Sequence, residues 1–145
     1  MSSVALRSAT EEDQKFLYES YKITLKPYVE WAWGWDEKFQ RENFQIHFPI
    51  PQFQVISVNG SDAGGLYVEE QRSLRFIRLI YLLPEFQYKG IGHHMIVQEI
   101  EKAKAAKKSL HLKVVKINPA KSLYDRLGFM LLKENDVTYH LHLPV

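Results

Sequence analysis

A short loop with anion-binding chemistry follows the longest strand-like run of the chain. Residues 76–83 form an apolar run rich in β-forming residues. Pro84 ends this run, because proline has no N–H to donate to a β-ladder. From Ile91 onwards apolar residues recur at helical spacing. The sequence therefore predicts a strand, a loop over residues 84–90 and a helix that begins at the end of the loop.

The glycines of this loop lie where the helix begins. The first N–H groups of a helix have no partner within the helix, and the helix dipole adds positive potential there. Gly90 and Gly92 carry no Cβ that would hinder an anion, and Lys89 adds a positive charge. These features suit a pyrophosphate, although two glycines alone also fit a simple turn. A P-loop and a dinucleotide fingerprint are excluded, because His93 and His94 follow Gly92 and a third glycine is missing.

Two segments resemble conserved motifs of one enzyme superfamily. The segment 87–92, Gln-Tyr-Lys-Gly-Ile-Gly, resembles the Q/R-x-x-G-x-G/A signature of the GNAT superfamily of N-acetyltransferases. The segment 118–129 resembles a second GNAT motif, in which an asparagine precedes A-x-x-x-Y-x-[K/R]-x-G-F. The two segments stand in the expected order, separated by a helix and a strand. The resemblance covers roughly residues 77–129, about a third of the chain.

The resemblance implies a fold, a co-substrate and a set of contacts. The fold is of the α/β (α+β) class: a mixed, mostly antiparallel sheet with a parallel pair at strands 4 and 5, flanked by helices on both faces. Acetyl-CoA is implied between these two strands, which splay apart in the family. The implied cofactor-binding residues are Leu82, Gln87, Tyr88, Lys89, Gly90, Ile91, Gly92, His93 and Asn118. A backbone amide near Leu82 would polarise the thioester carbonyl.

The second motif places Tyr124 near the coenzyme sulfur. A phenol stays protonated at neutral pH, so this residue could act as the general acid that protonates the leaving thiolate. The alternative is a half-buried ring on an amphipathic helix between Leu123 and Leu127.

The acceptor side carries no motif and is inferred by elimination. All three tryptophans fall within residues 31–35, beside several acids. Rings and acids together suit a cationic amine, whereas the alternative is that the rings plug the end of a small core. The predicted substrate-binding residues are Tyr28, Glu30, Trp31, Trp33 and Tyr81. The general base stays open among Glu30, Asp36, Glu37, Glu85 and a water held by the Tyr81 hydroxyl.

The remaining pattern predicts the order β-α-α-β-β-β-α-β-α-β-β. A strand over residues 4–7 precedes a helix that Thr10 caps and Pro27 ends. Asp36 caps a second helix with Phe39, Phe44 and Ile46 on its apolar side. Strands are expected over residues 53–58, 63–69, 74–83, 110–115, 130–133 and 137–143, and helices over residues 90–107 and 118–128. Asn59-Gly60 predicts a tight turn, and Gly64-Gly65 a bulge or a close approach.

Three histidines raise the question of a metal site. His140 and His142 point to one side of their strand and could join His111 in binding zinc. A solvent-facing alternation is favoured over this alternative, so no metal is expected.

Composition bounds the remaining function classes. The chain has 145 residues, with 46% hydrophobic and 13% aromatic residues, and we expect a single domain over residues 1–145. A formal net charge of +2 is too small to indicate nucleic-acid binding, and the basic run 102–108 fits a solvated helix end. No apolar run reaches the ~20 residues of a membrane span, and there is no cysteine or signal-peptide pattern. A cytoplasmic protein without a membrane or nucleic-acid partner is expected.

Three hypotheses follow. The leading one is an acetyl-CoA-dependent N-acetyltransferase that transfers the acetyl group directly, in a ternary complex, to a small-molecule or exposed peptide amine. A non-catalytic acyl-CoA-binding sensor on the same fold is the alternative, and a nucleic-acid-binding protein using the run 102–108 is the third. The last two strands are also available for pairing in a homodimer.

Overall fold

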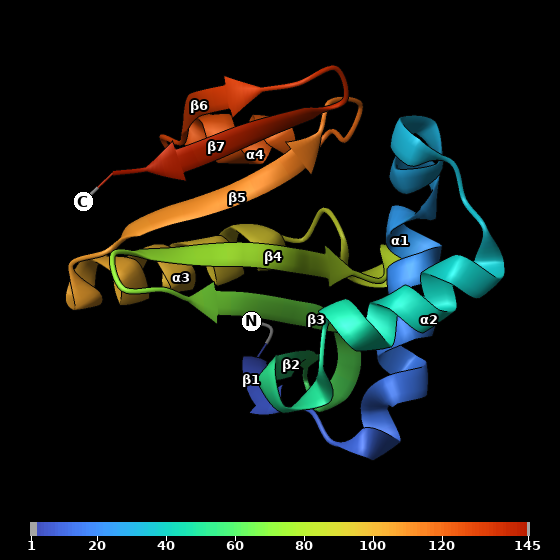
Figure 1. Cartoon of the computed structure of the whole chain (residues 1–145). Coiled ribbons are helices and arrows are strands. Elements are labelled where there is room, and N and C mark those ends of the chain that lie inside the picture. The colour runs from blue at the N-terminus through green and yellow to red at the C-terminus, as the bar shows by residue number, and fades with distance from the viewer. Residues whose placement is uncertain (1–2, 145) are drawn as a thin grey trace.

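A seven-stranded sheet with helices on both faces forms the protein (Figure 1). The structure is a computed structural model that describes residues 3–144. Its elements, in chain order, are β1 (Val4–Ser8), α1 (Gln14–Trp33), α2 (Glu37–His47), β2 (Phe53–Val58), β3 (Ser61–Glu70), β4 (Leu74–Leu82), α3 (Ile91–Ala106), β5 (Ser109–Val115), α4 (Lys121–Arg126), β6 (Met130–Glu134) and β7 (Thr138–Leu143). The predicted order of elements is confirmed.

The strand order in the sheet is β1-β2-β3-β4-β5-β7-β6. Only β4 and β5 pair in parallel among these strands, and every other neighbouring pair is antiparallel. The connection between β4 and β5 runs through α3, as a parallel crossover requires. The predicted mixed sheet with a parallel pair at strands 4 and 5 is therefore confirmed.

Two apolar clusters hold the helices on opposite faces of the sheet. Behind the sheet in Figure 1, α3 and α4 pack on one face with Ile96, Leu112 and Tyr124. At the other face, α1 and α2 pack on β2, β3 and the end of β4 through Leu17, Phe44 and other buried side chains. The site described below lies at the C-terminal ends of β4 and β5, next to both clusters.

The first helix does not end at Pro27, contrary to the sequence prediction. Helix α1 continues through this proline to Trp33, and Gly34 at φ +79° closes it. A proline inside a helix costs one hydrogen bond and a steric clash. Leu25 and Val29, on either side of Pro27, both pack against the buried cluster under α1. We infer that this tertiary packing outweighs the local preference of proline.

The second helix is capped as predicted but exposes more apolar surface than predicted. The Asp36 carboxylate accepts a hydrogen bond from the Phe39 N–H at 2.9 Å. Phe44 is buried, whereas the side chains of Phe39 and Ile46 are 58% and 71% exposed. The predicted apolar side of this helix is thus buried at Phe44 only.

The glycine pair in β3 marks a close approach of two strands. A Cβ at Gly64 would lie 1.9 Å from the Tyr81 carbonyl oxygen, and a Cβ at Gly65 would lie 2.6 Å from the Tyr81 hydroxyl. Real Cβ atoms do not approach so closely, so only glycine fits here. The predicted tight turn before β3 also forms, with positive φ at both Asn59 and Gly60.

The parallel strands β4 and β5 separate beyond their first four pairs. Their ladder runs from Leu74 opposite Ser109 to Ile77 opposite Leu112. Beyond it β4 continues to Leu82 and β5 to Val115 without pairing to each other. A β-bulge at this point shifts the register of β4 against β3. The separation opens a cleft at the C-terminal ends of both strands.

Candidate active site

A cavity of about 390 Å³ occupies the cleft between the separated strands. It is lined by α1 on one side and by the loop before α3, the start of α3 and the α4 segment on the other. The cavity brings together most of the predicted site residues. Those that line it are Tyr28, Tyr81, Leu82, Gln87, Tyr88, Gly90, Gly92, His93, Asn118 and Tyr124. Glu30, Trp31, Trp33, Lys89 and Ile91 are not among the lining residues.

The loop before α3 has the backbone geometry of an anion cradle. Gly90 is the N-cap of α3 and has φ +80°, a left-handed conformation that favours glycine. The Gln87 side-chain amide donates a hydrogen bond to the Leu82 carbonyl at 2.8 Å, which ties the loop to the end of β4. The start of α3 is thereby held at the cavity, and binding of a pyrophosphate by its first amides stays a prediction.

Gly92 leaves room beside the first turn of α3. A Cβ built at this position would meet one atom within 4 Å, the Leu123 Cδ2 at 3.8 Å. The glycine is therefore not required by close packing. Its open space faces the cavity, which is consistent with a ligand that approaches the backbone.

The segment after β5 closes the side of the cavity opposite α1, where the coenzyme is predicted to bind. The Asn118 carboxamide oxygen accepts a hydrogen bond from the Ala120 N–H at 2.9 Å and shapes the turn into α4. Asn118, Pro119 and Ala120 all line the cavity. The side chain of Asn118 thus builds the turn that borders the predicted pantetheine path.

Tyr124 presents a protonated phenol to the cavity. Its ring is buried and packs edge-on against Phe129, with ring centroids 5.8 Å apart. Burial raises the pKa of the Tyr124 hydroxyl to about 12, so the group keeps its proton at neutral pH. Among residues 3–144 no group hydrogen-bonds to this hydroxyl. The proton is therefore available to a molecule in the cavity.

The middle of α1 forms the wall of the cavity that was predicted to bind the acceptor. Thr24, Leu25 and Tyr28 line it from successive turns of the helix. The predicted Trp31 and Trp33 lie on the last turn and are 49% and 63% exposed. The core-plug alternative fails for these two rings. It holds for Trp35, which is half-buried and lies 6.1 Å from the Tyr21 ring.

Tyr81 lines the cavity with its ring but directs its hydroxyl elsewhere. The hydroxyl donates a hydrogen bond to the Leu17 carbonyl of α1 at 2.8 Å. Burial raises the pKa of this phenol above its ordinary value. The proton of Tyr81 is therefore committed to joining β4 and α1, and only the oxygen lone pairs remain for a water.

Two of the four candidate bases are engaged in structural contacts. Asp36 caps α2. Glu37 accepts hydrogen bonds from Lys22, Tyr18 and Trp35, and these partners lower the pKa of its carboxyl to about 2. Such an acid is a weak base. Glu30 and Glu85 are exposed outside the cavity lining, and the identity of the base stays open.

The three histidines face one another on the sheet. His111 Nδ1 lies 2.9 Å from His140 Nε2, and the ring centroids of His111 and His142 are 5.4 Å apart. His111 is buried rather than solvent-facing, with 8% exposure. Within residues 3–144 no group of three or more histidines or acids has the geometry to hold a metal ion.

Some lining residues were missed by the sequence prediction. They are Thr24, Leu25, Ile80, Ile96, Ser122, Leu123 and Arg126, together with the turn residues Pro119 and Ala120. Thr24 and Leu25 lie four and three residues before Tyr28, so they share its helix face. The predicted helix end at Pro27 concealed this relation.

The exposed edge of the sheet concerns the predicted homodimer. β6 is an edge strand, and its Met130, Leu131 and Leu132 are each about half exposed. Pairing with a second copy through this strand stays a prediction.

In the described part of the chain, no helix has the length and hydropathy needed to cross a bilayer.

Solved structures of acetyltransferases share this fold. The PaiA N-acetyltransferase from Thermoplasma acidophilum, in complex with coenzyme A, is similar with a TM-score of 0.75 and 15% identity over 99% of each chain. Arabidopsis thaliana Naa50 in complex with the bisubstrate analogue CoA-Ac-MVNAL is similar with a TM-score of 0.69 and 14% identity over 99% of each chain. The ribosomal-protein-S18-alanine N-acetyltransferase from Escherichia coli gives 0.70 and 20%, over 99% of this chain and 94% of that one.

Sequence comparison identifies the family. No curated protein matches the chain at a significant level. The sequence model of the family described as "Acetyltransferase (GNAT) domain" matches residues 50–131, more than half of the 145 residues. The match runs from just before β2 into β6 and includes the loop before α3 and the whole segment with Tyr124. The chain belongs to the GNAT family of acetyltransferases.

Proposed function

We propose that the protein transfers an acetyl group from acetyl-CoA to a primary amine in a ternary complex of enzyme and both substrates. The observation that carries this proposal is the position of the Tyr124 hydroxyl. It is protonated, has no hydrogen-bond partner among the described residues, and lines the same cavity as the glycine loop. A cavity that combines an anion cradle with a proton donor is suited to acyl transfer from a phosphate-bearing thioester.

The coenzyme would lie between the separated strands. The amides of residues 88–92 would bind its pyrophosphate, with Gly90 and Gly92 allowing close approach and Lys89 and His93 at the rim. The unpaired edge of β4 near Leu82 would hold the pantetheine arm opposite Asn118. The contact between Gln87 and the Leu82 carbonyl would keep these two parts of the site in register.

The chemistry needs one bond formed and one bond broken. The acceptor nitrogen attacks the thioester carbonyl carbon, so that a C–N bond forms and the C–S bond breaks. The Tyr124 hydroxyl would donate its proton to the departing thiolate. A backbone amide at the end of β4, near Leu82, would stabilise the negative charge on the carbonyl oxygen. The amine loses its proton to a water or to a base that stays unidentified.

The acceptor would enter along α1. Tyr28 lines the cavity, and Glu30, Trp31 and Trp33 follow it on the exposed end of the helix. Exposed rings beside an acid can stack on and attract an ammonium group outside the cavity. A peptide amine is one acceptor class that the fold accommodates in other proteins, because the Escherichia coli protein named above is an alanine N-acetyltransferase of a ribosomal protein.

A non-catalytic acyl-CoA sensor is the second candidate function. It would use the same cavity and bind the coenzyme without turnover. The free proton on Tyr124 favours catalysis, because a sensor has no thiolate to protonate.

Coenzyme A release by the purified protein tests the proposal. Acetyl-CoA is supplied with a panel of amines that includes peptides with free N-termini, lysine derivatives and small diamines, and free thiol is measured over time. Binding of coenzyme A is measured in parallel by calorimetry. Turnover with at least one amine supports the proposal. Binding without turnover for the whole panel would favour the sensor, and absence of binding would contradict both.

A further inference from the structure

One part of the sheet has no helix over its front face. In Figure 1, α3 and α4 lie behind the sheet, and α1 and α2 lie over β2, β3 and the C-terminal ends of β4 and β5. The first halves of β4 and β5, together with β7 and β6, are uncovered in front. The register of the strands identifies the side chains on this face.

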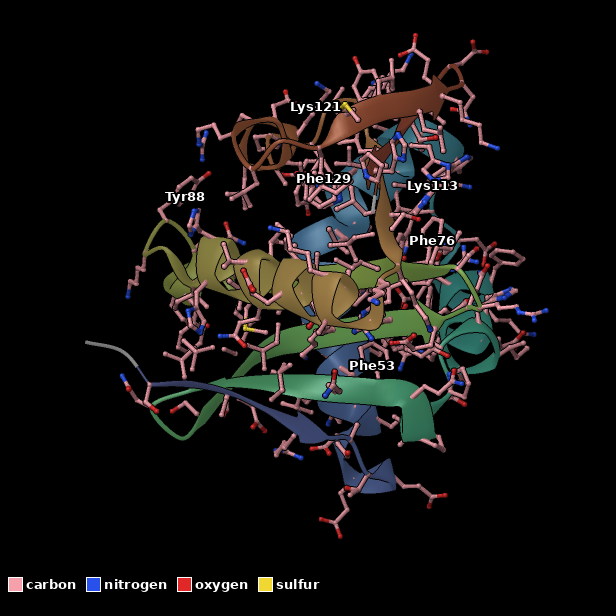
Figure 2. The ribbon with its side chains drawn as sticks, turned by 90° about the vertical axis from the view of Figure 1, so that its left-hand side faces the viewer. Phe53, Phe76, Tyr88, Lys113, Lys121 and Phe129 are labelled. Atoms are coloured by element: carbon pink, nitrogen blue, oxygen red, sulfur yellow. The ribbon has the colours of Figure 1, made fainter. Side chains whose placement is uncertain are left out.

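The uncovered face carries six basic or imidazole side chains. On β5 and β7, His111 stands opposite His142 and Lys113 opposite His140, alternating with leucines of the buried core behind the sheet. Lys133 of β6 also stands opposite His140. Figure 2 shows Lys113 and Phe76 on one side of the sheet and Tyr88 on the other. We call this set the basic face: Arg78, His111, Lys113, Lys133, His140 and His142.

Two lysines of the basic face carry uncompensated charge. Arg78 stacks on the Phe76 ring at 4.4 Å and forms an ion pair with Glu69 at 2.9 Å. Lys113 and Lys133 are exposed, and neither forms an ion pair with any residue in 3–144. The face is therefore positively charged when the imidazoles are neutral, and more so when they are protonated.

The imidazoles add a polar, hydrogen-bonding floor between the lysines. His111 contacts His140 through Nδ1 and the Ser109 hydroxyl through Nε2, at 2.9 and 3.0 Å. Burial, together with the positive charges of His111, Lys113, Lys133 and His142, lowers the pKa of His140 to about 4. These four groups are all cationic when charged, so the surroundings of His140 favour an anion.

The basic face continues into the acceptor side of the cleft. It includes Arg78 of β4 and Lys113 of β5, and these two strands separate to open the cavity. Tyr81, on the front side of β4, lines the cavity, and Arg78 lies three residues before it on the same strand. A chain that left the cavity towards the front would therefore meet the basic face first.

We propose that the basic face binds an acidic stretch of a polypeptide acceptor whose amino group enters the cleft. This inference rests on the proposed function and narrows it to peptides or proteins with carboxylates near the acetylated amine. Lys113 comes directly after Leu112, the partner of Ile77, and Leu82 at the cavity follows Ile77 by five strand residues. An extended chain rises about 3.3 Å per residue, so the carboxylates would lie roughly four to eight residues from that amine. The side chains of Lys113 and Lys133 would bind them as exposed ion pairs.

Fluorescence anisotropy with labelled decapeptides tests the surface apart from turnover. The peptides share a free N-terminus and differ at positions 4–8, which are glutamates, glutamines or lysines. The protein is used as the wild type, as the double variant Lys113→Glu, Lys133→Glu, and as the control Lys15→Glu, Lys104→Glu. The control makes the same charge change at two exposed lysines on α1 and α3 that also form no ion pair among the described residues. A duplex RNA is the fourth probe.

The expected result is a preference of about fivefold to tenfold for the glutamate peptide over the glutamine peptide. The double variant should lose this preference, and the control should keep most of it. Equal binding of the three peptides, or a preference that survives in the double variant, would overturn the proposal. Tighter binding of the RNA that depends on Lys113 and Lys133 would assign the face to nucleic acid instead. Because anisotropy needs no turnover, a failure of the proposed acetyl transfer would appear only in the coenzyme A release assay.

Discussion

The two sides of the cleft are built by different means. The predicted coenzyme side, residues 82–96 and 118–126, is a strand end, a glycine loop and two helix starts, and its geometry is set by backbone conformation. The predicted acceptor side, residues 24–33, is the second half of a long helix with exposed rings at its end. Gly90 is an example of a residue that sets the backbone on the coenzyme side, and Trp33 is an example of an exposed ring on the acceptor side. The backbone conformation of the coenzyme side can be predicted from residue types. The positions of the side chains on the acceptor side depend instead on how α1 packs against the sheet.

This difference explains why the coenzyme side could be predicted from the sequence in more detail than the acceptor side. A left-handed N-cap favours glycine, and an anion cradle requires a helix start, so the predicted function of this side could be inferred from residue types alone. A ring on a helix end is compatible with packing, recognition or neither. Substitutions on the two sides should therefore affect different steps of the reaction, which gives four predictions in order of expected size.

Removing the hydroxyl of Tyr124 should give the largest effect. In Tyr124→Phe the ring still packs against Phe129, but no proton can be donated to the thiolate. We expect kcat to fall by about 10²–10⁴-fold while the affinity for acetyl-CoA stays close to that of the wild type. Steady-state kinetics and calorimetry measure the two quantities. Full turnover in a folded variant would mean that water protonates the thiolate.

A branched side chain in the first turn of α3 should block the coenzyme. The open space beside Gly92 accommodates a Cβ without a clash inside the protein, so Gly92→Val should fold. The valine would occupy the space of the pyrophosphate, and we expect the affinity for acetyl-CoA to fall by about tenfold or more, as for one lost charged contact. The matched control is Gln98→Val, which puts the same side chain at an exposed position of the same helix. Unchanged affinity in a folded Gly92→Val protein would move the coenzyme site elsewhere.

Truncating an exposed ring on the acceptor side should affect the acceptor alone. Cation–ring contacts contribute about 0.5–2 kcal/mol, so Trp33→Ala should raise the acceptor KM by about two- to thirtyfold and leave the acetyl-CoA KM unchanged. Glu30→Gln should act in the same direction. Ile46→Ala, at an exposed apolar position of α2, is the control. If both KM values stay unchanged, the acceptor lies against another part of the molecule, and the last two strands become the next candidates.

The contrast between local backbone preferences and distant contacts also describes which parts of the fold were predicted from the sequence. Asn59-Gly60, Gly64-Gly65, Pro84 and Gly90 impose local backbone conformations, and the strands and helices around them were predicted within a few residues. Pro27 also restricts the local backbone conformation, but α1 continues through it, because the residues on both sides of it pack against the buried cluster. Local rules fail where a distant part of the chain supplies the deciding contact.

The roles of polar side chains on the acceptor side were hidden for the same reason. Tyr81 was predicted to face a substrate, yet its hydroxyl bonds to Leu17, 64 residues earlier in the chain. Glu37 was one of four candidate bases, yet Tyr18, Lys22 and Trp35 hold it as a structural acid. No sequence spacing reports such partners. The predicted roles of Tyr124 and of the glycine loop depended instead on motif spacing, and the cavity brings these residues together.

The smallest expected effect concerns Glu37, which joins α1 to α2. Its carboxylate binds Lys22 and Tyr18 of α1 and Arg41 of α2, so Glu37→Gln should loosen the support of the acceptor side without touching the coenzyme side. We expect the acceptor KM to rise by about twofold and the Tm to fall by about 2–4 °C near neutral pH, as for a surface ion-pair network.

The pH dependence separates this effect from a general loss of packing. The pKa of Glu37 is lowered from an ordinary value of 4.5 to about 2 by Lys22, Tyr18 and Trp35, so the folded state favours the ionised form. The stability contributed by this carboxylate is therefore present above about pH 4.5 and is lost as the pH falls through about 2. The Tm values of the wild type and Glu37→Gln should converge over that interval. A Tm difference that persists at pH 2 would indicate a general loss of packing in the variant. An increase in the acetyl-CoA KM would show that Glu37 supports both sides of the cleft and that the two sides are not independent.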